Sequence, residues 1–153
     1  MHPPYVAVVG ASAPEDPALL EQAREAGRSI ASRGWVLVTG GLGGVMAAAA
    51  SGAAAEGGTA IAMLPGMDRS AASPGHTLVI PTGLGEMRNA LLVRSADAVL
   101  AVGGSWGTLS EIAFAARTGV PAFTVAGWDL PGEGVLACGS AQEAVERIAA
   151  RLA

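Results

Sequence analysis

The chain contains no lysine, since all nine of its basic residues are arginines. This absence excludes a Walker phosphate loop, because that motif places a lysine after its last glycine. It also excludes a pyridoxal phosphate Schiff base, which forms on a lysine amine. Two large classes of phosphate-binding and cofactor-dependent protein are therefore ruled out.

Cysteine, histidine and positive charge are also scarce. The single cysteine, Cys138, allows neither an internal disulfide nor a cysteine metal cluster, which fits a reducing compartment. His2 and His76 are isolated in the sequence and are expected to be surface or loop residues, so no metal site is predicted. The net charge of −4 argues against a nucleic-acid-binding face.

Long apolar runs are missing as well. None reaches the 18 residues of a membrane-spanning candidate, and residues 1–5 lack the basic start of a signal peptide. With 153 residues, 51% of them hydrophobic and 14% charged, the chain is expected to form one compact domain over residues 1–153. We expect a cytoplasmic protein that does not contact membranes.

Short apolar runs alternate with helix-like segments along the chain. Near-continuous apolar runs are typical of strands buried on both faces, so the order predicts an α/β, doubly wound, mainly parallel sheet with helices on both faces, a Rossmann-like fold. Strands are predicted over residues 5–10, 35–39, 59–64, 76–80, 98–102, 121–125 and 135–138. Helices are predicted over residues 16–33, 45–56, 86–95, from 108 to near 119, and 140–152.

Residues 102–111, Val-Gly-Gly-Ser-Trp-Gly-Thr-Leu-Ser-Glu, join a predicted strand to a predicted helix. Glycines let a ligand approach the backbone, and a helix N-terminus offers unpaired N–H groups and partial positive charge. The expected guest is a phosphate, although the spacing is not that of the GxGxxG dinucleotide fingerprint. A second glycine loop, residues 40–44, follows another strand. Because ligands bind beyond the carboxyl ends of such strands, we expect both loops to converge on one crevice.

Two charged residues near these loops each have two interpretations. Arg88, at the start of a predicted helix, either clamps a phosphate beside a sugar-binding or base-binding Asn89, or faces solvent. Glu111 either stabilises positive charge on a ribose during glycosidic cleavage, or completes a capping box with Thr108. The segment from Ser140 to Glu143 has the same capping pattern without a glycine loop, which favours capping for Glu111.

Trp106 and Ser12 are also ambiguous. Trp106 either stacks on a base or pterin ring or packs the loop onto the core. Ser12 either bonds the ligand or makes a local turn. The complete set of residues predicted to bind the ligand is Ser12, Gly40, Gly41, Gly43, Gly44, Arg88, Asn89, Gly103, Gly104, Ser105, Trp106, Gly107 and Thr108.

Four segments together resemble the LOG superfamily of Rossmann-like proteins, and the resemblance spans roughly residues 5–150. Within that superfamily the chain most resembles the molybdenum cofactor carrier proteins and their uncharacterised bacterial relatives, many once labelled lysine decarboxylases. The resemblance implies dimers or larger oligomers, homodimers or homotetramers, for which apolar residues near Leu91, Leu92 and 112–116 could supply an interface. The four segments are residues 39–46, 81–89, 95–98 and 103–111.

The phosphoribohydrolase branch of the superfamily cleaves the base from nucleoside 5'-monophosphates. Arg88 and Glu111 match the pair that its mechanism uses. The chain departs from the branch's motifs at Gly103, Ser105 and Asn89, where the branch has proline, glycine and lysine. These departures put the hydrolase activity in doubt.

The sequence therefore predicts a binding or carrier protein for a small phosphorylated heterocyclic ligand, either molybdopterin cofactor or a nucleotide. No cofactor is expected to be required for catalysis; molybdopterin cofactor or a nucleotide would be present only as the bound ligand. The alternative is a phosphoribohydrolase in which Arg88 and Glu111 are catalytic. A third class, a subunit that binds nucleotide only to regulate a partner, stays open.

Overall fold

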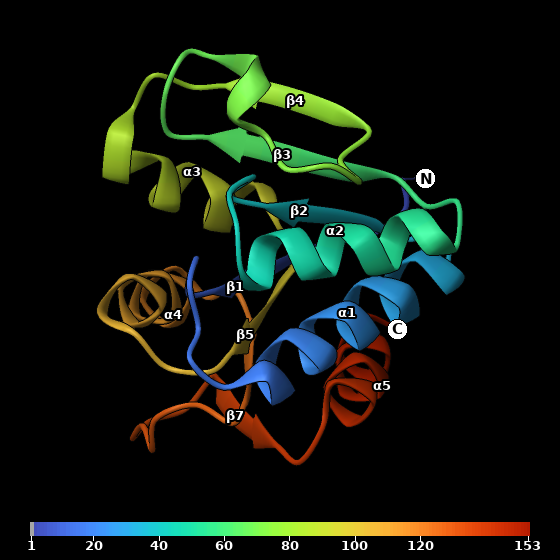
Figure 1. The fold of residues 1–153 in the computed structure, drawn as a ribbon. Coiled ribbons are helices and arrows are strands. Elements are labelled where there is room, and N and C mark those ends of the chain that lie inside the picture. Colours follow the sequence, from blue (N-terminus) through green and yellow to red (C-terminus); the bar gives the residue numbers. More distant parts are fainter. Residues whose placement is uncertain (1) are drawn as a thin grey trace.

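The computed structural model describes residues 2–153 and contains a seven-stranded sheet in which every pairing is parallel (Figure 1). The spatial order is β4-β3-β2-β1-β5-β6-β7. The predicted doubly wound α/β fold is thus confirmed, with strand bounds within two residues of those expected. The strands are β1 (Tyr5–Gly10), β2 (Val36–Thr39), β3 (Ala60–Leu64), β4 (Leu78–Pro81), β5 (Ala98–Val102), β6 (Ala122–Val125) and β7 (Val135–Cys138).

Helices cover both faces of the sheet. The cluster of buried residues on one face takes in α1, α2 and α5, and the cluster on the other face takes in α3 and α4. Their bounds are α1 (Pro17–Ser32), α2 (Val45–Ala55), α3 (Arg88–Ser95), α4 (Trp106–Thr118) and α5 (Ala141–Leu152), with short 3-10 turns η1 (Arg69–Ala71) and η2 (Gly85–Met87).

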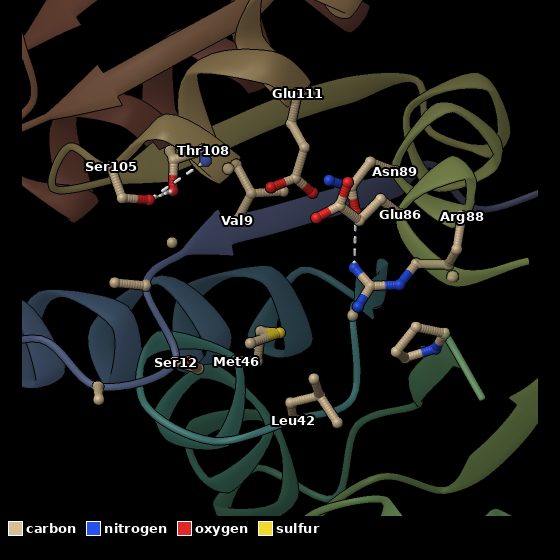
Figure 2. Close-up of a pocket in the computed structure, with 17 residues that line it drawn as sticks. Val9, Ser12, Leu42, Met46, Glu86, Arg88, Asn89, Ser105, Thr108 and Glu111 are labelled. Atoms are coloured by element: carbon tan, nitrogen blue, oxygen red, sulfur yellow. Dashed lines mark hydrogen bonds between the residues drawn. The ribbon is translucent and has the colours of Figure 1, made fainter.

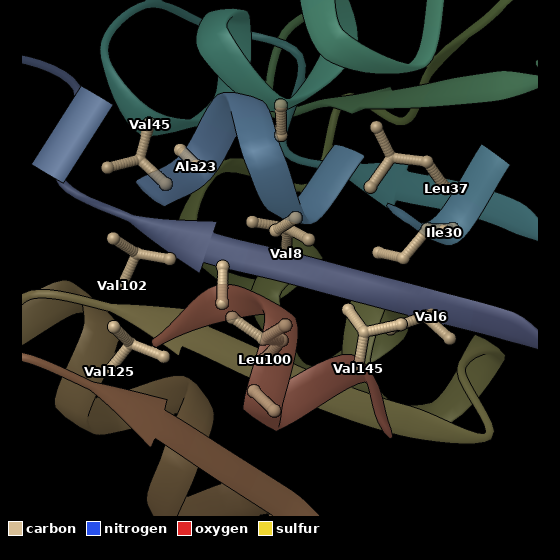
Figure 3. Packing of buried hydrophobic residues seen from close by; sticks show 14 of the residues in the cluster. Val6, Val8, Ala23, Ile30, Leu37, Val45, Leu100, Val102, Val125 and Val145 are labelled. Carbon is tan, nitrogen blue, oxygen red and sulfur yellow. The ribbon is translucent and has the colours of Figure 1, made fainter. Parts of the chain in front are cut away.

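The strands supply side chains to both layers in turn. In β1, Val6 and Val8 pack beneath α1, whereas Ala7 and Val9 pack toward α3 and α4 (Figure 3). This period of two in a strand with four fully apolar central residues explains why its sequence shows no polar alternation. On the α3 and α4 side, Leu92 is fully buried in the core, so core packing accounts for one residue expected at an interface.

Two glycines let α1 and α2 meet backbone to backbone. A Cβ on Gly27 would collide with the carbonyl oxygen of Ala49, and a Cβ on Gly52 would collide with that of Arg24. Only a hydrogen side chain allows this approach. The small residues of α2 therefore allow it to pack closely on α1. This packing positions α2, whose first turn borders the crevice.

The reversal of strand order lies between β1 and β5. Strands β1 to β4 are laid down in one direction, after which the chain returns so that β5 pairs with the other side of β1. At such a point the loops after the two central strands turn away from each other and leave a crevice. The fold thus places the loops after β1 and β5 around one opening.

Candidate functional site

A crevice of about 530 Å³ opens at the carboxyl ends of β1 and β5 (Figure 2). The loops after β1, β2 and β5 all contribute to it, so the predicted convergence of the two glycine loops is confirmed. Of the predicted site residues, those that line it are Ser12, Gly40, Arg88, Asn89, Ser105, Gly107, Thr108 and Glu111, and those that do not are Gly41, Gly43, Gly44, Gly103, Gly104 and Trp106.

The lining also includes residues that sequence reasoning missed. Most are small or apolar and carry no chemical signature, but Glu86, two residues before Arg88, could have been found from its place in the same motif. The missed lining residues are Val9, Gly10, Ala11, Ala13, Leu42, Met46, Pro65, Gly85 and Glu86.

The N-terminus of α4 forms one wall. Ser105 is its N-cap, and the Ser105 hydroxyl accepts a hydrogen bond from the Thr108 N–H at 3.2 Å. The N–H groups of Trp106 and Gly107 have no partner inside the helix, because the first turn of any helix lacks them. A Cβ on Gly107 would meet nothing within 4 Å, so this backbone is open to the crevice. The arrangement suits an anion.

The expected capping role of Glu111 is wrong. Thr108 lies in the first turn of α4 and does not cap it, since the helix begins two residues earlier than predicted and Ser105 takes the cap. In the comparison segment Ser140 caps α5 as expected, since the Glu143 N–H donates to the Ser140 hydroxyl at 3.2 Å. The Glu143 carboxylate reaches back as well, but it accepts from the Gly139 N–H at 2.7 Å, one residue before the cap. The same pattern thus has a different outcome in α4 and leaves the Glu111 carboxylate for another use.

Glu111 is a buried carboxylate that faces the crevice (Figure 2). Its exposed fraction is 7%, and among residues 2–153 no donor forms a hydrogen bond with it. Loss of solvent raises the pKa of Glu111 from its usual 4.5 to about 7, against the opposing effect of the positive charge on Arg88. A carboxylate in this state can exchange a proton near neutral pH or accept a hydrogen bond from a ligand.

Arg88 is buried, so the solvent-facing alternative is wrong. Its exposed fraction is 8%, and Nη1 donates to Asn89 Oδ1 at 2.8 Å. Its Nε is fully buried with no hydrogen-bond partner among the described residues. Burial lowers the pKa of Arg88 and the negative charge of Glu111 opposes that effect. An arginine stays protonated even so, and the crevice therefore contains an incompletely satisfied cation.

Arg88 and Glu111 come from the neighbouring helices α3 and α4 and both line the crevice, but they form no ion pair. The ion pairs formed within residues 2–153 involve other side chains, at exposed or half-exposed positions. Figure 2 shows the guanidinium and the Glu111 carboxylate entering the same space from α3 and α4. Both charged groups therefore border the space that a ligand would occupy.

The glycines of the two loops, apart from Gly107, make room for other parts of the protein. A Cβ on Gly103 would lie 2.9 Å from Leu19, and one on Gly104 would lie 2.5 Å from the Trp128 ring. A Cβ on Gly44 would meet the backbone of Ala11. The space that a side chain at Gly103 or Gly104 would occupy is therefore filled by protein, and the contact of these two residues with a ligand stays a prediction. They allow the loop to pack on α1 and on the segment after β6.

A relay of hydrogen bonds holds the loop after β2. The Ser73 carbonyl lies 2.9 Å from His76 Nδ1, and His76 Nε2 lies 2.7 Å from the Thr39 hydroxyl, which accepts from the Gly41 N–H at 2.9 Å. A carbonyl can only accept, so Nδ1 carries the proton and Thr39 donates to Nε2. Burial lowers the pKa of His76, which favours this neutral ring. His76 is thus a half-buried structural residue of the site's support.

Trp106 is the first residue of α4 and is 79% exposed, so its core-packing alternative is wrong. Its ring packs edge-to-face on Trp128, with centroids 4.9 Å apart. It borders a second hollow beside the crevice.

The fold and the site together define a Rossmann-like protein with a crevice at the topological switch point, lined by apolar residues and by Arg88 and Glu111. Residues 3–149 match the SLOG cluster4 family, and the chain therefore belongs to that family. The expected likeness to the LOG superfamily and to molybdenum cofactor carrier proteins is confirmed by this match and by the relatives below.

Two solved structures are similar over nearly the whole chain. The molybdenum cofactor binding protein of the phototrophic bacterium Rippkaea orientalis is 34% identical, with a TM-score of 0.95 over 100% of this chain and 99% of that one. The molybdenum cofactor carrier protein of Chlamydomonas reinhardtii is 31% identical, with a TM-score of 0.87 over 99% of each chain.

One curated relative is named for a hydrolase activity. The cytokinin riboside 5'-monophosphate phosphoribohydrolase of Mycobacterium marinum is 39% identical over 111 residues, which are 70% of this chain and 59% of that protein. The matches span about six tenths of the length of the curated relatives.

None of the helices in residues 2–153 has the length and the apolar character of a membrane span. The same residues contain no group of three His, Cys, Asp or Glu side chains that could hold a metal ion.

Proposed function

We propose that this chain is a binding or carrier protein for a phosphorylated heterocyclic ligand, either molybdopterin cofactor or a nucleotide. In this proposal it acts in the cytoplasm as a homodimer or homotetramer, with residues 1–153 as a single binding domain. The observation that carries the proposal is the convergence of the α4 N-terminus and the buried, incompletely bonded Arg88 on one crevice. The likeness to two molybdenum cofactor proteins supports the first ligand.

The ligand's phosphate would lie against the N–H groups of Trp106 and Gly107. There it meets the positive end of α4, while Arg88 supplies a full positive charge from α3. Ser12, an exposed hydroxyl on the loop after β1, would close the third side. The volume of about 530 Å³ lies within the range of small-molecule sites.

One observation favours phosphoribohydrolase activity as the second candidate. Glu111 is free of the capping bond and lines the same crevice as Arg88, with its pKa raised by burial to about 7. In this alternative Arg88 would position the ribose phosphate and Glu111 would stabilise the oxocarbenium-like transition state. The curated relative from Mycobacterium marinum supports it.

Calorimetric titration with ribose 5-phosphate and guanosine 5'-monophosphate tests the binding proposal. Saturable binding of guanosine 5'-monophosphate that inorganic phosphate displaces is the expected result. A protein that binds neither probe, and from which mass spectrometry of the purified sample recovers no phosphorylated heterocycle, contradicts the proposal.

Release of free guanine from the same nucleotide separates the carrier from the hydrolase. If the chain is a hydrolase, wild-type protein should release guanine and Glu111→Gln should not. This variant keeps the size of the side chain and disturbs no helix cap. The carrier predicts binding without release in both proteins.

A further inference from the structure

A second hollow of about 490 Å³ adjoins the crevice. It shares Glu86, Asn89 and Gly107 with the crevice, so the two hollows meet at these residues beside the first turn of α4. Its own residues are Met87, Trp106 and Ser110. We call this hollow the annex.

Two large side chains form the walls of the annex and are mostly exposed. Met87 is 74% exposed and Trp106 is 79% exposed. Trp106 does not hang free, because its ring is braced edge-to-face on Trp128, which lies over the backbone of Gly104. The contact with Trp128 holds the Trp106 ring in a solvent-exposed position, which core packing does not explain.

The floor of the annex is polar. Asn89 Nδ2 lies 3.5 Å from Ser110 Oγ, and the Ser110 hydroxyl donates to the Gly107 carbonyl at 2.6 Å. Asn89 also accepts from Arg88, so one amide connects the annex with the guanidinium in the crevice. Apolar walls above a floor with amide and hydroxyl groups suit the faces and the edge of a heteroaromatic ring.

We infer that the annex holds the planar ring of the ligand, stacked on Trp106 and Met87, while its phosphate lies in the crevice. The class of ring is a fused two-ring heteroaromatic such as a purine or a pterin. The inference rests on the proposed function and assigns its specificity to Trp106.

The position of Trp106 supports this division of the ligand. As the first residue of α4, it carries both a backbone N–H that has no partner within the helix and the side chain that forms the annex wall. A ligand whose ring and phosphate are joined through one sugar or a linker of similar length can therefore reach both. Methionine adapts to varied ring shapes, because its side chain is flexible and polarisable.

Two probes that differ only in the ring test the inference. Wild-type protein should bind guanosine 5'-monophosphate more tightly than ribose 5-phosphate, and Trp106→Ala should weaken the nucleotide about tenfold while leaving the sugar phosphate unchanged. Trp106→Phe should restore most of the loss. Leu136→Ala, which removes an exposed apolar side chain from β7, is the matched control and should change neither affinity.

Each other outcome identifies what fails. If wild-type protein binds guanosine 5'-monophosphate and ribose 5-phosphate equally tightly, the proposed phosphate site is supported but the annex does not bind the ring. If Trp106→Ala weakens both probes equally, Trp106 only shapes the α4 N-terminus. If it leaves both affinities intact and lowers the mass measured by light scattering, the annex is a contact between copies. If neither probe binds, the proposed function fails and this inference fails with it.

Discussion

Gly40 and Arg88 lie in direct contact in the wall of the crevice. A Cβ at residue 40 would lie 2.6 Å from Arg88 Nη1 and 2.8 Å from the sulfur of Met46. The glycine that follows β2 therefore accommodates the cation that we propose as the phosphate clamp. Without a side chain at this position, the guanidinium can approach the backbone closely.

We predict that Gly40→Ala lowers the affinity for ribose 5-phosphate about tenfold, because the added methyl group displaces a charged hydrogen-bond donor. Titration calorimetry measures the change. Gly66→Ala is the control, since a Cβ there would meet nothing within 4 Å. Equal affinities for Gly40→Ala and wild type would mean that the guanidinium does not contact the phosphate.

Removing the cation itself should have a larger effect. Arg88→Ala is expected to weaken ribose 5-phosphate by about tenfold to a hundredfold, the range for charge-assisted hydrogen bonds. Arg94→Ala on the same helix removes an exposed guanidinium and controls for the change in net charge. If both variants lose affinity to the same extent, the effect comes from long-range charge and Arg88 is not the clamp.

The fold could be predicted because the five inner strands of the sheet are buried on both faces. Residues 98–102 are all apolar and form β5 over the predicted bounds, and the Asp16-Pro17 start of α1 is confirmed by a hydrogen bond from the Ala18 N–H to Asp16. Both signals are local. The convergence of the two glycine loops followed from the general rule for parallel sheets.

The chemistry of the site depends on contacts between distant segments, which local patterns do not report. Either the Ser105 or the Thr108 hydroxyl is a suitable cap for α4, and the sequence pattern alone does not distinguish them. The contact of Arg88 with Gly40 and the bond between Thr39 and His76 each join segments that are far apart in the sequence.

The serine N-caps of α4 and α5 allow stability to be separated from binding. Ser105→Ala and Ser140→Ala should each lower the free energy of unfolding by about 1 kcal/mol, since each removes a hydroxyl that accepts a first-turn N–H. Urea titration measures this. Only Ser105→Ala should also weaken ribose 5-phosphate, because α4 borders the crevice and α5 does not. Loss of affinity in Ser140→Ala as well would show that the effect on binding is a general consequence of lower stability.

The buried carboxylate of Glu111 should make stability depend on pH. Its folded-state pKa of about 7 lies above the usual 4.5, so the folded protein holds a proton that the unfolded chain releases. Stability is therefore greatest below about pH 4.5 and falls as pH rises through about 7, by on the order of 3 kcal/mol in total. Glu111→Gln, which cannot ionise, should escape this loss.

Urea titrations of wild type and Glu111→Gln at about pH 5 and about pH 8 measure the difference. The variant should be only slightly more stable than wild type at the lower pH and more stable by an additional 1 to 3 kcal/mol, roughly, at the higher one. Glu86→Gln, at an exposed position on the same crevice, controls for the loss of one negative charge. A gap between Glu111→Gln and wild type that stays constant with pH would show that Glu111 ionises freely. In that case the carboxylate would be solvated, and neither proton exchange near neutral pH nor the second candidate function could rest on its burial.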